Sequence, residues 1–260
     1  VNRDSDSLSV LLGDGGGGFA AKTDFTAGDS PSSVAVADLD GDGNLDLVSA
    51  NFDSNDLSVL LGDGVGGFAA KSDFAAGDSP ASVAVADLDG DGNLDLVSAN
   101  VNSNNLSVLL GNGVGGFATK ADFAAGQGPR SVGVADLDGD GSLDLVSANV
   151  NSDNLSVLLG DGAGGFAVKT DFVAGNGPVS VAVADVDSDG NLDLVSANLF
   201  SDNLSVLLGD GIGGFSTRTD FAAGTSPQSA AVADLNGDGK LDLVSADSGS
   251  DSLSVLLARP

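Results

Sequence analysis

The sequence predicts an all-β fold: a five-bladed β-propeller of 49-residue, four-stranded repeats, with one spare terminal strand. Three observations lead to this prediction. The same segments recur every 49 residues, and each period holds four short strand patterns. The composition, with 39 Gly and with Asp as every one of the 38 acidic residues, favours strands and tight turns over helices. We therefore expect residues 1–260 to form a single repeat domain.

Three sequence elements define the period. The segment LSVLL occurs six times, first at Leu8 and last at Leu253, and a GGF element occurs five times, first ending at Phe19. An acidic segment, DLDGDGNLDLVSAN or a close variant, begins at Asp38, Asp87, Asp136, Asp185 and Asp234. Repetition at this spacing is typical of propellers, whereas a parallel β-solenoid, the alternative fold, normally has much shorter coils.

Within one period the expected strands are residues 33–37, 46–50, 57–61 and 68–74. The first reads SVAVA, with small or apolar residues on both faces, as an innermost strand wedged between neighbouring blades requires. The fourth reads FAAKSDF and carries charge, which suits an outer edge. Turn residues separate the strands, so each period is expected to be an antiparallel meander.

The predicted strands include one extra copy of the third strand of the repeat. We expect blades at about 26–75, 76–124, 125–173, 174–222 and 223–257, the last closed by a fourth strand from residues 18–25. Residues 8–12 and 253–257 have the same sequence, LSVLL, and compete for one place. The extra strand is either an idle leftover or a strand that pairs with another molecule, and head-to-tail pairing would build a larger ring or a filament.

The loop between the first and second strands has the pattern D-x-D-x-D-G-x-x-D. Ca²⁺ binds about six to eight oxygen ligands in flexible geometry, and carboxylates at alternating positions of a tight loop can converge on one ion. Glycine at the sixth position allows the turn, the seventh residue offers its backbone carbonyl and the ninth closes the site. Five loops with this spacing predict about five Ca²⁺ per chain, whereas Asp and Gly as simple turn residues would explain only an isolated copy.

The expected ligands are, copy by copy, Asp38, Asp40, Asp42, Asn44 and Asp46; Asp87, Asp89, Asp91, Asn93 and Asp95; Asp136, Asp138, Asp140, Ser142 and Asp144; Asp185, Asp187, Asp189, Asn191 and Asp193; and Asp234, Asn236, Asp238, Lys240 and Asp242. The fifth copy has Asn236 in place of an aspartate and Lys240 at the seventh position, so its site should be the weakest.

Composition argues against several classes of function. A formal net charge of −29 disfavours nucleic acids and anionic membrane surfaces as partners. The chain contains no His, Cys, Tyr or Glu to act as nucleophile or general base, and the paired Asp residues belong to the metal loops. We therefore expect a protein that is not an enzyme and is not inserted in a membrane.

The segments SVAVADLDGDGNLDLVSAN and LSVLLGDGxGGF resemble the FG-GAP or VCBS repeats, which also form the propeller of integrin α subunits. The resemblance recurs five times and covers nearly the whole chain. It implies an extracellular propeller with calcium in the loop joining the first two strands of each blade. Because the first residue is Val1, the chain is expected to be a processed product or a fragment of a secreted or cell-surface protein.

These observations favour a structural or adhesion module that self-associates through its terminal strand and meets an extracellular protein or glycan. A calcium-dependent, lectin-like glycan-binding module is the alternative. Sugars usually stack on Trp or Tyr, which the chain lacks, so Phe52 and Phe200 in the variable loops are the candidate sugar contacts.

Overall fold

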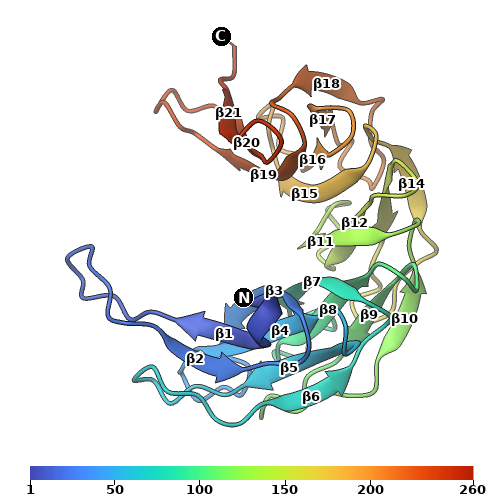
Figure 1. The fold of residues 1–260 in the computed structure, drawn as a ribbon. Coiled ribbons are helices and arrows are strands. Elements are labelled where there is room, and N and C mark those ends of the chain that lie inside the picture. The colour runs from blue at the N-terminus through green and yellow to red at the C-terminus, as the bar shows by residue number, and fades with distance from the viewer. Residues whose placement is uncertain (260) are drawn as a thin grey trace. The chain divides into compact units, whose positions relative to one another are not determined.

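The computed structural model describes residues 1–259 and consists of short antiparallel sheets (Figure 1). It contains 21 strands and one short 3₁₀ helix, η1 (Arg3–Ser5). Within these residues no helix is long and apolar enough to span a membrane. The chain divides into two compact units, Val1–Phe123 and a second that starts at Ala124.

The strands fall into four classes by their place in the repeat. The first strands are β3 (Pro31–Ala37), β7 (Pro80–Ala86), β11 (Pro129–Ala135), β15 (Pro178–Ala184) and β19 (Pro227–Ala233). The second strands are β4 (Asp46–Asn51), β8 (Asp95–Asn100), β12 (Asp144–Asn149), β16 (Asp193–Asn198) and β20 (Asp242–Asp247). The third strands are β1 (Ser7–Val10), β5 (Asp56–Leu60), β9 (Asn105–Leu109), β13 (Asn154–Leu158), β17 (Asn203–Leu207) and β21 (Ser252–Leu256). The fourth strands are β2 (Thr23–Thr26), β6 (Ser72–Ala75), β10 (Ala121–Ala124), β14 (Thr170–Val173) and β18 (Thr219–Ala222).

Each sheet is a meander in sequence order. Four sheets have four strands, β3–β6, β7–β10, β11–β14 and β15–β18, while β19–β21 form a three-stranded sheet and β1 pairs with β2. The predicted all-β fold of propeller-like, four-stranded repeats is confirmed.

The first three strands of the repeat lie where the sequence predicts them, but the fourth is shorter than expected. In the first full repeat it begins at Ser72 and not at Phe68. Phe68 instead forms an isolated bridge with Gly62 across a tight hairpin, and its ring packs edge-on against Phe25 at 5.0 Å. The aromatic residue therefore belongs to the hairpin, and only the last part of the predicted segment extends the sheet.

The N-terminal strands pair with each other. β2 lies beside β1, with Leu8 opposite Phe25. The closing of the fifth blade by residues 18–25 stays a prediction. Leu8 is buried against Ala27, Leu47 and Leu60. The first LSVLL copy thus pairs with β2, whereas the last copy, in β21, pairs with β20.

The core lies between consecutive sheets. In the first unit, Val48, Leu57 and Val59 of the sheet β3–β6 pack with Leu96 and Leu109 of the next sheet, and all five are at most 2 % exposed. The second unit repeats this arrangement with Val146, Leu155, Val157, Leu194 and Leu207. In the four four-stranded sheets the second and third strands are buried on both faces, so each of these sheets needs a neighbour on either side.

Candidate metal centre

The acidic loops join the first two strands of each repeat. In the first copy the loop leaves β3 at Ala37 and enters β4 at Asp46. Gly41 and Gly43 have φ angles of 74° and 89°, in the left-handed region that favours glycine. Ser188 stands at the Gly41 position in the fourth copy and keeps a φ of 64°, so the loop geometry persists there despite the side chain.

The loop backbone holds its own carboxylates in place. The two oxygens of Asp38 accept hydrogen bonds from the amides of Gly41 and Gly43, both at 2.9 Å. Asp42 accepts the amide of Asn44 at 2.7 Å and the Asn44 side-chain amide at 2.9 Å. In the other four copies, the backbone amide of the glycine at the sixth position likewise donates a hydrogen bond to the first aspartate.

The aspartate at the ninth position is buried and ties the loop to the end of the third strand. Asp46 is 0 % exposed, and its two oxygens accept the amides of Leu39 and Gly62, both at 2.7 Å. Asp95, Asp144, Asp193 and Asp242 accept the corresponding pairs of amides in their own repeats. This aspartate is therefore a structural anchor as well as a candidate ligand, which the sequence analysis did not foresee.

Four of the five loops bring three carboxylates together, with ligand atoms within 4.8 Å of one another. The groups are Asp38, Asp40 and Asp42; Asp87, Asp89 and Asp95; Asp136, Asp138 and Asp144; and Asp185, Asp187 and Asp193. The fifth loop, with Asn236, is not among them. The fifth-position residues Asp91, Asp140 and Asp189 lie outside the groups and accept the amides of Asn93, Ser142 and Asn191. Ligation through the seventh-position carbonyls stays a prediction.

Burial and mutual repulsion disfavour the ionised form of several of these carboxylates. Desolvation raises the pKa of Asp95 above its ordinary value of 3.8, and the neighbouring charges of Asp89 and Asp91 add to the effect. Desolvation likewise raises the pKa of Asp144, Asp193 and Asp40. A bound cation would remove this penalty, because opposite charge favours the ionised carboxylate.

The residues fit a hard divalent cation. The donors are carboxylate and amide oxygens without any sulfur or imidazole nitrogen, and the described residues show three of them converging in each of four loops. Oxygen donors at this spacing suit Ca²⁺, whereas Mg²⁺ demands a near-ideal octahedron and keeps more water.

A second polar feature, which the sequence analysis missed, runs across the buried strands. Asn51 donates to Ser58 at 2.8 Å, and Ser58 donates to Asp73 at 2.7 Å. Ser49 donates to Asn51 at 2.9 Å, and these two residues are, like Ser58, 0 % exposed. The serines that alternate with apolar residues in DLVSAN and LSVLL were the available signal, since polar residues in otherwise buried strands require partners.

The two candidate sugar contacts differ in their surroundings. Phe200 is 64 % exposed and lies against Gly177, where a Cβ atom would come within 2.4 Å of its ring. Phe52 is half-buried, and the Arg3 guanidinium lies over its ring at 5.1 Å from the centroid. Of these two residues, Phe200 is therefore the one that offers an uncovered aromatic surface.

Comparisons with known proteins agree with this arrangement. An FG-GAP-like repeat model matches residues 1–49, 38–98, 87–147, 136–196 and 185–245. No curated protein matches.

Solved structures share the fold at low sequence identity. An Agrocybe aegerita lectin, described as recognising non-reducing terminal N-acetylglucosamine, is 20% identical, with a TM-score of 0.64 over 96% of this chain and 74% of its own. A functionally unknown protein from Desulfotomaculum acetoxidans DSM 771 is 14% identical, with a TM-score of 0.69 over 99% and 77% of the two chains. The V. cholerae biofilm matrix protein Bap1 is 20% identical, with a TM-score of 0.54 over 87% of this chain and 37% of its own. From the five repeat matches, which span residues 1–245, we conclude that the chain belongs to the FG-GAP-like repeat family.

Proposed function

We propose that this protein is a non-catalytic, extracellular, calcium-stabilised propeller module that serves adhesion or structure and assembles with further copies of itself through its terminal strands. The observation that carries the proposal is the convergence of three carboxylates in each of four repeat loops. Five Ca²⁺ ions would offset about a third of the net charge of −29 and so reduce the repulsion that opposes compaction.

The similar folds are compatible with this role. A lectin and a biofilm matrix protein are among the solved structures that share the fold, and both descriptions concern recognition or matrix formation and not catalysis. The absence of His, Cys, Tyr and Glu from the sequence supports the same view, since these residues supply most nucleophiles and general bases.

Thermal unfolding with and without calcium tests the metal part of the proposal. Protein freed of metal should unfold at a temperature many degrees below protein in millimolar calcium, because the converged carboxylates repel one another without an ion. Magnesium at the same concentration should stabilise less, and titration calorimetry should count about four to five sites. Equal melting temperatures with and without calcium would rule out a structural role for the ion.

A calcium-dependent glycan-binding module is the second candidate. The exposed ring of Phe200 favours it, because aromatic faces pack against sugar rings. A glycan array probed in calcium and in chelator should show calcium-dependent binding that Phe200→Ala abolishes and the matched Phe52→Ala retains. Binding that is indifferent to both substitutions would place the sugar site elsewhere.

A further inference from the structure

The tight hairpin that ends in the GGF element is tied to the metal loop of its own repeat. In the repeat β15–β18 this hairpin spans residues 209–215. The amide of Gly209 donates to the buried Asp193, the ninth residue of the fourth loop, at 2.8 Å. A Cβ on Gly211 would stand only 2.3 Å from Oδ1 of Asn191, the seventh residue of that loop. The hairpin and the loop of one repeat therefore hold each other in place.

The same hairpin also packs against the metal loop of the preceding repeat. A Cβ on Gly213 would stand 3.6 Å from the Cβ of Asp138, which belongs to the converged carboxylate group of the third loop. The carbonyl oxygen of Gly211 lies 3.6 Å from where a Cβ on Gly139, in the third loop, would stand. Residues 209–215 thus lie between the third and fourth metal loops and contact both.

The first unit shows the same arrangement at the hairpin of residues 111–117. A Cβ on Gly113 would stand 2.2 Å from Oδ1 of Asn93, in the second loop. The carbonyl oxygen of Gly113 lies 3.7 Å from where a Cβ on Gly41, in the first loop, would stand. A hairpin that contacts two consecutive metal loops is therefore found in both units.

The hairpin is closely packed on the preceding sheet. The ring of Phe215 packs edge-on against Phe172 of β14, with 5.1 Å between ring centroids. A Cβ on Gly213 would stand 3.0 Å from the side chain of Leu159, which follows β13. Close-packed groups transmit strain because they have little room to yield. A shift of the hairpin at one loop is therefore passed on to the other loop.

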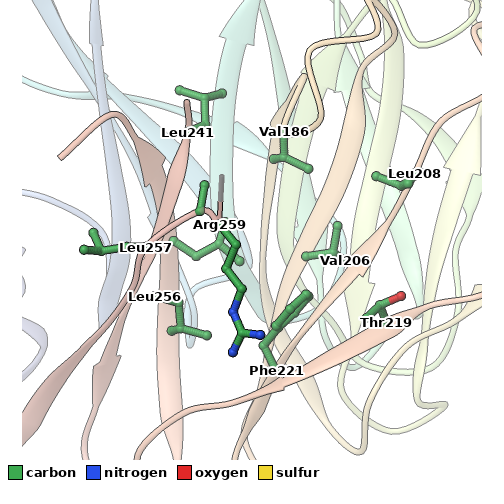
Figure 2. A pocket seen from close by; sticks show the side chains of 11 residues that line it. Val186, Val206, Leu208, Thr219, Phe221, Leu241, Leu256, Leu257 and Arg259 are labelled. Atoms are coloured by element: carbon green, nitrogen blue, oxygen red, sulfur yellow. The ribbon is translucent and has the colours of Figure 1, made fainter. Parts of the chain in front are cut away.

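Figure 2 shows the corresponding place between the fourth and fifth loops. Leu208 occupies the position of Leu159 one repeat later, and it lines a cavity of about 690 Å³ together with Val186 of the fourth loop and Leu241 of the fifth. The described hairpin contacts thus join the first loop to the second and the third loop to the fourth.

We propose that the hairpin is a shared positioning element of two consecutive calcium sites, so that calcium bound at either loop raises the affinity of the other. This coupling deepens the proposed function and rests on its calcium sites. Calcium draws together carboxylates that otherwise repel one another, and so it orders the loop and the hairpin that the loop holds. The second ion then binds a loop whose neighbour is already ordered, which gives positive cooperativity, and linkage makes the effect mutual.

Charge alone predicts the opposite sign of coupling. The first ion brings two positive charges near the second site, so electrostatic repulsion would weaken the binding of the second ion. Salt screens this repulsion beyond about 8 Å at physiological ionic strength, whereas close packing is not screened. The sign of the coupling therefore distinguishes the hairpin from the field of the ions.

Calcium titrations followed by NMR test the coupling loop by loop, because the glycine at the sixth position differs in number from loop to loop. The amides of Gly141 and Gly190 report on the third and fourth loops. Asp187→Asn weakens the fourth loop directly and keeps the side-chain oxygen that accepts an amide of the loop. The calcium concentration that half-saturates the third loop should rise about fivefold or more, while that of the first loop, read at Gly43, should not change.

An unchanged or lower half-saturating concentration at the third loop would overturn the proposal, because charge alone predicts that result.

A substitution in the hairpin tests whether it carries the coupling. Gly211→Ala places a Cβ against Asn191 of the fourth loop. If the hairpin links the two sites, this one substitution should raise the half-saturating calcium concentration at both Gly190 and Gly141. An effect at Gly190 alone would show that the hairpin does not connect the loops.

Gly162→Ala is the matched control for backbone strain. Its φ of 67° is close to the 72° of Gly211, but the new Cβ would stand 3.1 Å from Oγ of Ser142, which leaves more room. It should weaken its own loop less than Gly211→Ala weakens the fourth. Adding Asn191→Ser to Gly211→Ala keeps the backbone carbonyl and makes the same room, so it should restore calcium binding at both loops. Failure of this rescue would mean that strain, and not the contact, caused the loss.

The titrations also separate this coupling from the wider proposal. If the glycine amides of the natural protein do not respond to calcium, the calcium part of the proposed function fails and the coupling fails with it. If they respond while Asp187→Asn and Gly211→Ala leave Gly141 unaffected, the calcium sites stand and the coupling alone is wrong.

Discussion

At the residue scale, each repeat loop combines two kinds of aspartate. Asp144 is 1% exposed and accepts the amides of Leu137 and Gly160, so it anchors the loop whether or not an ion is bound. Asp138 belongs to the same carboxylate group but lies nearer the surface. The two roles can be separated because only the anchor satisfies buried backbone donors.

Asp144→Asn should destabilise the metal-free protein by about 1–3 kcal/mol, because its amide nitrogen cannot accept the hydrogen bond that it replaces. Asp138→Asn should leave the metal-free protein within about 0.5 kcal/mol of the natural one and reduce only the stabilisation by calcium. Urea unfolding with and without calcium measures both. Equal losses for the two variants in the metal-free state would contradict the anchoring role of Asp144.

The raised pKa values of Asp95, Asp144 and Asp193 predict how calcium stabilisation depends on pH. Because the folded-state pKa of these carboxyl groups lies above the ordinary 3.8, their ionisation costs more free energy in the folded protein than in the unfolded chain. The stability that they contribute below pH 3.8 is therefore lost as the pH rises through their folded-state pKa values. Calcium binds the ionised form and restores that loss. The rise in melting temperature on adding calcium to metal-free protein should therefore be larger at pH 7 than at pH 4, and an equal rise would contradict carboxylate ligation.

At the scale of the element, one repeat position has two environments. Leu155 on β13 is 0% exposed and packs with Val146 and Leu194, whereas Leu253, at the same position on β21, is 71% exposed. The residue type and the local strand are the same, so the difference comes from the neighbouring sheet alone.

Leu155→Ala should cost about 2–5 kcal/mol, because it leaves a cavity between two sheets. Leu253→Ala should cost less than about 1 kcal/mol in the unassembled protein. Chemical unfolding at low protein concentration provides the comparison. A loss at Leu253 as large as that at Leu155 would show that another surface already covers β21.

At the scale of the whole molecule, charge sets the conditions under which the repeats are stable. The chain carries 38 acidic residues against 9 basic ones, and the ion pairs of the described residues, such as Lys71–Asp73, join an aspartate of a fourth strand to the basic residue just before that strand. Long-range repulsion among the loops therefore persists without calcium.

Sodium chloride should raise the melting temperature of the metal-free protein more than that of the calcium-loaded protein, because mobile ions screen charge that bound calcium otherwise neutralises. Melts at about 0.05 and 0.5 M salt, with and without calcium, measure the difference. An identical salt response in both states would mean that loop repulsion does not limit stability.

The repeat, the all-β fold and the acidic loops could all be predicted from the sequence. Each follows from local chemistry repeated at a constant spacing: alternating apolar residues form strands, and Asp and Gly form tight, oxygen-rich turns. The convergence of Asp136 and Asp138 was predictable for the same reason, because both lie within a few residues of one turn.

Features that depend on which sheets are neighbours could not be predicted from the sequence and are seen in the packed structure. Identical LSVLL segments gave no basis for predicting that β2 would pair with β1, or that Leu8 would be buried while Leu253 is exposed. Two backbone amides donate hydrogen bonds to Asp46. One of them belongs to Gly62, which lies 16 residues further along the chain, just after another strand. Burial and hydrogen-bond satisfaction are properties of packed sheets, so equal sequences acquire different roles once their neighbours differ.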